Sequence, residues 1–197
     1  CRPGIAYPTS VSQSAVSKPV IGDIVYANAT IQYVRETPKR GLVFRHGGVE
    51  WPSRAHPEVR LCIAAVSDAS HGSEDECLDD WDEREPFRSQ GAKLIFLASK
   101  DILGDSQAGW VHLVSWSSTT LKRVVSSTMK AESYQLTEVV EAADLMRATL
   151  ADCHGKLDWD DWETSASHWC VSQWSTDCRS CSDTIEKPVN KGIDKRL

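Results

Sequence analysis

Residues 109–134 read GWVHLVSWSSTTLKRVVSSTMKAESY, and this stretch decides the interpretation of the chain. Its first part, residues 109–116, is an apolar segment of strand length. From Thr128 to about residue 152 the apolar residues instead recur at helical spacing and form one stripe, made by Leu136, Val139, Val140, Ala143, Met146 and Leu150. The pattern predicts a strand followed by a long amphipathic helix, with Gly155 as the helix stop.

One carboxylate, Glu132, falls on the apolar side of the predicted helix, four residues before Leu136. A carboxylate that faces a core is unfavourable unless it is paired, hydrogen-bonded or bound to a metal. A capping box would require Ser or Thr three positions earlier, but position 129 is methionine. The position of Glu132 therefore indicates a role other than helix capping.

Upstream, a second acidic residue follows a predicted strand. Residues 61–66 are a continuous apolar run, typical of a central strand covered on both faces, and Asp68 lies at its end. Residues 92–98 read as the next strand. Because the strands at 61–66, 92–98 and 109–116 follow one another, we expect an antiparallel meander.

Downstream, a third acidic residue has a similar position. Residues 168–175 read as a strand, which is followed by Asp177 and a short helix over 178–187. Asp177 could equally be only the N-cap of that helix. Between the long helix and this strand, Trp159 and Trp162 flank acidic residues in a predicted surface connection.

Asp68, Glu132 and Asp177 thus share a topological setting. In open α/β sheets the carboxyl ends of strands and the nearby helices form the usual crevice for ligands. Three converging carboxylates repel one another, and divalent cations are the simplest compensation, with oxygen-only ligation favouring Mg²⁺ or Mn²⁺ over zinc. Such a site suits phosphodiester hydrolysis by two metals about 4 Å apart. For each acid singly, a helix cap or a solvated surface charge is the alternative.

The first part of the chain is organised differently. Residues 2–16 and 20–36 read as two modest helices, and residues 41–45 as a short strand. Glycine and proline punctuate residues 46–57 as in a linker. We expect a domain boundary near residue 58, with a small helical appendage before it.

The distribution of charge and the cysteine content indicate which classes of function fit the chain. The net charge of -6 is dominated by one loop, residues 74–85, whose eight acids and one base give -7 and leave +1 for the remainder. The body is therefore about neutral, without a dense basic stripe. Seven cysteines, an odd number, favour reduced thiols and an intracellular compartment. Cys178-x-x-Cys181 lacks a second ligand pair, so packing thiols are favoured there over a zinc or redox module.

No apolar run approaches the length of a membrane span, and the first residues lack the pattern of a signal peptide. We interpret the chain as a fragment of something longer.

Residues 109–134 resemble the ribonuclease H domain of copia-type LTR retrotransposon Pol polyproteins. That family has a G-Y-V-like strand, S-W-S-S, a short basic linker, and S-S-T followed by A-E and often Y. This chain has Gly109-Trp110-Val111, Ser115-Trp116-Ser117-Ser118, Lys122-Arg123 and Ser126-Ser127-Thr128-x-x-Ala131-Glu132-x-Tyr134. The spacing from Thr128 to Ala131 is one residue wider than in the commonest form. Upstream, residues 2–7 (RPGIAY) resemble the R-P-D-I-x-Y segment at the end of the reverse transcriptase, with Gly4 replacing the acid.

The resemblance implies an α/β fold of the ribonuclease H type: an antiparallel meander plus parallel strands in a mixed sheet, flanked by helices. Residues 1–57 would be the C-terminal remnant of the reverse transcriptase connection. Residues 58–197 would be the ribonuclease H-like domain, C-terminally truncated and with an acidic insertion at about 71–89.

The resemblance also implies an activity, namely metal-dependent hydrolysis of the RNA strand of RNA/DNA hybrids during reverse transcription. Asp68, Glu132 and Asp177 match the family's catalytic acids, which would bind two Mg²⁺ or Mn²⁺ ions. Its last acid, in a downstream A-D-x-x-T-K motif, has no counterpart here, since Asp194 lies in a loop-like segment.

The expected partners are the hybrid and the remainder of the Pol polyprotein, with no membrane, in the cytoplasm and in virus-like particles. The alternative is a catalytically inactive fragment that acts at most as a nucleic-acid-binding or structural module. A thiol-based metal module at Cys178 and Cys181 is a third possibility.

Overall fold

A four-stranded mixed sheet forms the centre of the protein. The computed structural model describes residues 2–52, 61–71, 89–103, 108–122 and 125–186. The strand order is β3-β2-β1-β4, with bounds β1 (Leu61–Ser70), β2 (Gln90–Ser99), β3 (Val111–Thr120) and β4 (Cys170–Thr176). β1 pairs with β2 and β2 with β3 in antiparallel fashion, whereas β1 and β4 are parallel. The predicted α/β class, the meander and the parallel pairing are confirmed.

The central strand β1 is covered unevenly. Leu61, Cys62 and Ile63 are buried, so the prediction of coverage on both faces holds for the first part of the strand. The second part alternates, with buried residues at Ala65, Ser67 and Ala69 and exposed ones at Val66, Asp68 and Ser70. The predicted run, residues 61–66, reaches only the start of this half, and the prediction fails at its last residue, Val66, which is exposed. Asp68 consequently lies within β1, on the less covered side.

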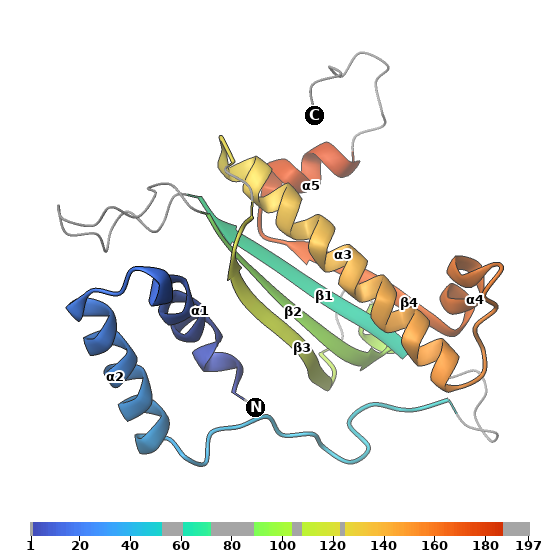
Figure 1. The fold of residues 1–197 in the computed structure, drawn as a ribbon. Coiled ribbons are helices and arrows are strands. Elements are labelled where there is room, and N and C mark those ends of the chain that lie inside the picture. Colours follow the sequence, from blue (N-terminus) through green and yellow to red (C-terminus); the bar gives the residue numbers. More distant parts are fainter. Residues whose placement is uncertain (1, 53–60, 72–88, 104–107, 123–124, 187–197) are drawn as a thin grey trace.

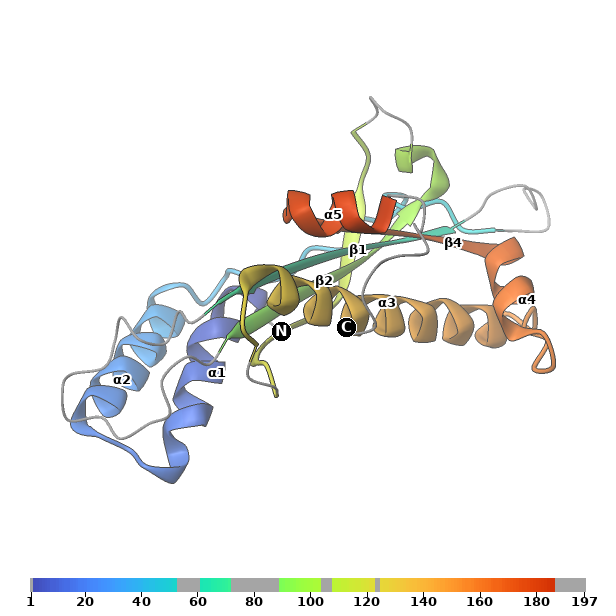
Figure 2. The ribbon, with the colours of Figure 1, turned by 90° about the horizontal axis from the view of Figure 1, so that it is seen from above.

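Helix α3 (Thr128–Cys153) lies along one face of the sheet (Figures 1 and 2). Its N-cap Ser127 accepts a hydrogen bond from the backbone N–H of Lys130 (3.3 Å). It ends as predicted at a left-handed Gly155 with φ of 62°, a conformation that suits glycine. Both ends of the predicted helix are therefore confirmed.

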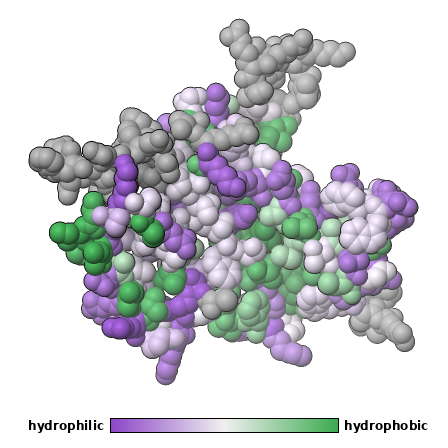
Figure 3. Space-filling model, viewed as in Figure 1, coloured by the Kyte–Doolittle hydropathy of each residue, from purple (hydrophilic) through white to green (hydrophobic). Residues whose placement is uncertain are grey.

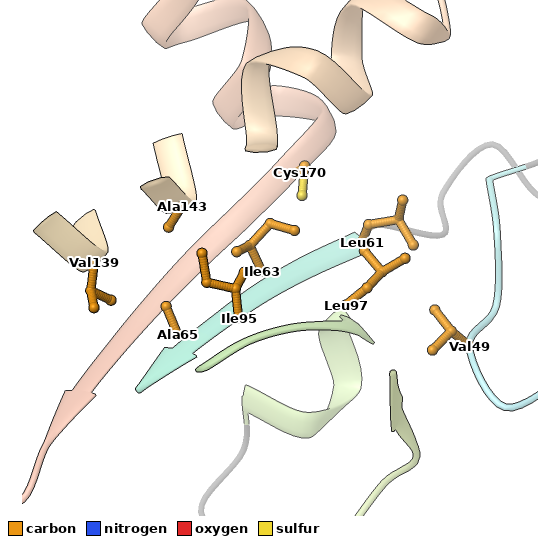
Figure 4. Packing of buried hydrophobic residues seen from close by; sticks show 9 residues of the cluster. All are labelled: Val49, Leu61, Ile63, Ala65, Ile95, Leu97, Val139, Ala143 and Cys170. Atoms are coloured by element: carbon orange, nitrogen blue, oxygen red, sulfur yellow. The ribbon is translucent and has the colours of Figure 1, made fainter. Parts of the chain in front are cut away.

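The main core lies between α3 and the sheet. Val139 and Ala143 of α3 pack against residues of β1 and β2, among them Ile63 and Ile95 (Figure 4). Burying side chains of this size contributes about 1.5–3 kcal/mol each. The same cluster includes Val49, which is only 4% exposed and precedes the predicted boundary near residue 58. That boundary itself lies outside the described residues.

The segment between α3 and β4 differs from the prediction. Residues 162–169 form a helix, α4 (Trp162–Trp169), and β4 begins at Cys170, so the predicted strand start at residue 168 is wrong. Trp162 is the first residue of this helix and does not lie in a surface connection. Buried Ala166 and core-packed Trp169 follow Trp162 at helical spacing, which explains why this segment is helical.

The two helices predicted before residue 37 are confirmed as α1 (Ala6–Ser14) and α2 (Ile21–Glu36), with short 3₁₀ turns, η1 (Pro3–Ile5) and η2 (Ala15–Ser17), on either side of α1. Asp23 accepts the backbone N–H of Val20 (2.8 Å) at the start of α2. At the other end of α2, the Arg2 guanidinium donates to the carbonyls of Val34 (3.1 Å) and Arg40 (3.0 Å) and to Thr37. These bonds satisfy carbonyls that a helix end leaves free.

The predicted strand at residues 41–45 is wrong. No ladder joins these residues to the four-stranded sheet, and they reach β3 through side chains instead. The Arg45 guanidinium lies over the Trp110 ring (4.1 Å to its centroid), and Phe44 meets His112 edge-on at 5.4 Å. Cation–π and aromatic contacts therefore replace backbone pairing here.

Several apolar side chains of α2 remain exposed. Ile21 is 81% exposed and Val25 is 62% exposed. Figure 3 shows apolar side chains on the part of the surface formed by α1 and α2, at the left of the view. None of the helices in the described part of the chain combines the length and hydropathy that crossing a membrane requires.

Candidate metal centre

The three acidic residues predicted from the sequence meet at one end of the sheet. Asp68 comes from β1, Glu132 from the second turn of α3, and Asp177 from the turn between β4 and α5 (Arg179–Glu186). One carboxylate oxygen of each lies within 4.8 Å of the others. Among the described residues, no other group of three potential metal ligands meets in this way. The arrangement could hold a metal ion.

Sheet register explains how Asp68 and Asp177 meet. In the parallel ladder, Ser67 of β1 is paired with Thr176, the last residue of β4, so Asp68 and Asp177 each come one residue after this pair. A shift of one residue would move each side chain to the opposite face. The β1–β4 pairing therefore places both carboxylates at the same level of the sheet.

A small apolar cluster places the third acid. Ala131, immediately before Glu132, is fully buried and packs with Ala69 of β1 and with Leu121 and Val125, which precede α3. The small side chains of Ala69 and Ala131 allow a close approach of helix and strand. The start of α3 is thereby held against the half of β1 that carries Asp68.

Glu132 is 3% exposed, whereas Asp68 and Asp177 are exposed. One Glu132 oxygen, Oε1, accepts the backbone N–H of Ala69 (3.1 Å), and the other, Oε2, accepts the hydroxyl of Thr176 (3.5 Å). Burial raises the pKa of the Glu132 carboxyl above its ordinary value, and the negative charges of Asp177 and Asp68 add to the shift. The two hydrogen bonds oppose it only in part.

This electrostatic state has a chemical consequence. A carboxylate with a raised pKa beside two others marks a place where negative charge lacks compensation. A divalent cation would supply that compensation and favour the ionised form of all three groups. The donor set consists of oxygen atoms alone, which suits Mg²⁺ or Mn²⁺ better than zinc.

Sequence reasoning missed Thr176. Its hydroxyl donates to Glu132 and accepts the backbone N–H of Cys178 (3.2 Å), so it links the helix acid to the turn that carries Asp177. The available signal was its position directly before Asp177 at the end of a strand. Only the parallel pairing of β4 with β1 shows that this hydroxyl faces Glu132.

Gln135 and Gly91 form a close contact near the candidate metal centre. Gln135, one turn after Glu132, is 1% exposed, and its side-chain end lies against the backbone of Gly91 in β2. A Cβ at Gly91 would overlap Gln135 and come within 2.8 Å of Leu121 Cδ2. The absence of a side chain at this position lets β2 and the first turns of α3 pack closely.

Some other residues of interest near the metal centre belong to the described part of the chain, and others do not. His71 contacts the Val125 carbonyl through its Nε2 (3.0 Å). Cys178 follows Asp177 directly, and both Cys178 and Cys181 are free thiols. Asp194 and most of the acidic insertion lie outside the described residues.

Comparisons of the chain with protein-family models, with curated proteins and with solved structures gave no match.

Proposed function

We propose that this chain is a retrotransposon ribonuclease H, which hydrolyses the RNA strand of RNA/DNA hybrids with Mg²⁺ or Mn²⁺ at Asp68, Glu132 and Asp177. The observation that carries the proposal is the convergence of these carboxylates within 4.8 Å from three separate elements. The mixed sheet is compatible with the ribonuclease H-like fold that the sequence resemblance implies. The copia-type pattern at residues 109–134 supplies the substrate class.

The three acids would have different roles. Glu132 is fixed in orientation by Ala69 and Thr176, so it would act as the rigid ligand of the site. Asp68 and Asp177 are exposed, which leaves their oxygens accessible from the solvent side where a substrate phosphate would approach. When bound, divalent cations would supply activation of a water molecule and charge stabilisation at the scissile phosphate.

Basic residues near the start of α3 support the approach of a phosphate backbone. Lys122 and Lys130 are exposed, and Lys130 Nζ donates to Ser126 Oγ (3.1 Å). Lys130 lies two positions before Glu132. Exposed lysines at this end of α3 would neutralise part of the charge of a bound phosphate backbone, and binding would weaken as salt rises.

The test is cleavage of an end-labelled RNA/DNA hybrid by the 197-residue chain in Mg²⁺ or Mn²⁺, with single-stranded RNA and duplex DNA as comparison substrates. We expect cuts in the RNA of the hybrid alone, and none in EDTA. Asp68→Asn should abolish cleavage, because it removes a ligand charge. Asp152→Asn, the same change on an exposed residue at the far end of α3, is the matched control and should retain full activity.

Two results would count against the enzyme. Hybrid binding without cleavage in either metal would favour the inactive nucleic-acid-binding module. Cleavage that survives Asp68→Asn would come from a contaminant or from another site.

A further inference from the structure

Cys178 and Cys181 occupy defined positions at the start of α5. The Cys178 carbonyl accepts the backbone N–H groups of Cys181 and Ser182, both at 3.0 Å. Cys178 is therefore the N-cap of this helix and Cys181 its third residue. The two cysteines lie at the same end of the helix, three positions apart in the sequence.

The two thiols differ in accessibility. Cys181 is 3% exposed, and its sulfur contacts Ser133 Oγ of α3 (3.6 Å). Cys178 is half-buried, and its sulfur lies 3.2 Å from Ser180 Oγ, which is exposed. An accessible first thiol beside a buried second one suits attack by a small molecule followed by internal closure.

We propose that Cys178 and Cys181 form a reversible dithiol–disulfide site that reacts with low-molecular-weight disulfides such as oxidised glutathione, and that its closure displaces Asp177. The Cys178 sulfur attacks one sulfur of the small disulfide and releases one small thiol. The Cys181 sulfur then attacks the Cys178 sulfur and releases the second. Two electrons pass from the protein sulfurs to the small disulfide, and the two thiol protons end on the released thiols.

Closure has a structural consequence because a disulfide holds the two β-carbons about 3.5–4.5 Å apart and so fixes Cys178 relative to Cys181. Cys181 is held in the interior against α3, so the N-cap residue Cys178 is the one that moves. Asp177 is its peptide neighbour, and Thr176 accepts the Cys178 N–H while donating to Glu132. Oxidation would therefore shift the metal ligand Asp177 directly, and it would also shift Thr176, which holds the second ligand, Glu132. The effect of oxidation on metal binding rests on the metal site proposed above, whereas disulfide formation does not.

The disulfide is tested by equilibrating the full chain with graded mixtures of reduced and oxidised glutathione, followed by alkylation and peptide mass mapping. We expect the peptide that contains Cys178 and Cys181 to lose two hydrogen atoms, and reductant to restore them. Cys62 and Cys170 are internal controls, because burial raises their pKa values to about 11 and about 12 and should keep them reduced. Cys178→Ser, which introduces a hydroxyl oxygen suited to an N-cap, should leave Cys181 unoxidised.

Two outcomes would overturn the disulfide. One is a stable glutathione adduct on Cys178 with Cys181 still free. The other is full reduction of both thiols under conditions in which the exposed Cys153 becomes modified.

The coupling is tested by Mn²⁺ titration of the reduced and oxidised chain, with free Mn²⁺ followed by electron paramagnetic resonance. We expect affinity to fall by about fivefold or more on oxidation, the lower end of typical coupling between sites. Cys178→Ser should bind Mn²⁺ equally well under both conditions. Equal affinity of the two wild-type forms would overturn the coupling. Absence of Mn²⁺ binding by the reduced protein would overturn the metal site and the coupling together, while the mass result would still decide the disulfide.

Discussion

The contact between β1 and α3 is apolar at one end and contains a buried carboxylate at the other. At one end, Ile63 of β1 meets Val139 and Ala143 of α3 in a hydrocarbon core. At the other, the residues that meet are Ala69 and Ala131, and the larger side chain that fills the space is the carboxylate of Glu132. The same strand and helix therefore supply packing at one end and concentrated charge at the other.

This difference shows how a buried acid can be retained. Domains of ordinary size are stable by about 5–15 kcal/mol, and each large buried apolar side chain contributes about 1.5–3 kcal/mol. The apolar end holds several such side chains. It can therefore offset an unfavourable carboxylate at the other end, provided that the shared helix remains rigid. If the two ends are independent, a substitution at one end should leave the properties of the other unchanged.

The largest effect is expected from Ile63→Ala in the apolar end. Ile63 is fully buried, so truncation removes transfer energy and leaves a cavity, and the free energy of unfolding should fall by about 3–4 kcal/mol. Urea unfolding measures the loss. Mn²⁺ affinity of the folded protein should stay within about twofold of the wild type if the two ends are independent. A larger change would mean that the core also positions the carboxylates.

Gly91→Ala should have the next largest effect, because the new methyl group overlaps buried Gln135 and Leu121. We expect a loss of about 2 kcal/mol, typical of overpacking, together with weaker Mn²⁺ binding as the start of α3 is pushed away. Gly22→Ala in α2 is the matched control, since its nearest neighbour is 3.9 Å away, and it should be neutral or stabilising. If both substitutions behave alike, the Gly91–Gln135 contact does not position Glu132.

Sequence reasoning succeeded where one local pattern determines the outcome. The apolar stripe of α3 and the position of Glu132 on its inner side are read directly from helical spacing, and the continuous apolar run at 61–66 identifies a central strand. The three acids could be selected because each lies at an element end or on an unexpected face. Their mutual distance could not be predicted, because it depends on the register between β1 and β4, which are far apart in the sequence.

The errors have a common physical origin. Residues 41–45 have the composition of a strand, but they contact the β3 side of the sheet through the side chains of Phe44 and Arg45 and do not pair with its backbone. Residues 162–169 form a short helix whose spacing rests on Trp162, Ala166 and Trp169, whereas the sequence prediction placed Trp162 in a surface connection and Trp169 in a strand. Thr176 was missed because its role arises only when Glu132 is placed opposite it. In each case the deciding contact is tertiary.

A smaller effect of opposite sign is expected from Glu132→Gln. Burial and the two neighbouring acids raise the pKa of Glu132, so the folded state holds this proton more tightly than the unfolded state. Stability from this group is therefore present at acidic pH and is lost as pH rises through the folded-state pKa. At pH 7 without metal, Glu132→Gln should be more stable than the wild type by about 1 kcal/mol, with a flatter pH profile.

Thermal unfolding across pH 4–8 would measure this difference, and added metal should reverse the order. Mn²⁺ at tenfold above its dissociation constant should stabilise the wild type by about 1.4 kcal/mol and the variant by less. A variant that is less stable than the metal-free wild type at pH 7 would contradict the electrostatic account.

The smallest effect is expected at the far limit of the apolar end, where Trp51 stacks on His154 at 6.0 Å and His154 in turn lies 4.7 Å from Trp169. Trp51 is 46% exposed, so Trp51→Ala should lower the free energy of unfolding by only about 0.5 kcal/mol. Trp159→Ala, at a residue that is 73% exposed, is the control and should have no measurable effect. Chemical unfolding resolves the two variants. Val49, two residues before Trp51, is part of the main core. A loss of stability above about 2 kcal/mol in Trp51→Ala would therefore show that the ring contact holds Val49 in place. The apolar end would then depend on residues before the predicted boundary.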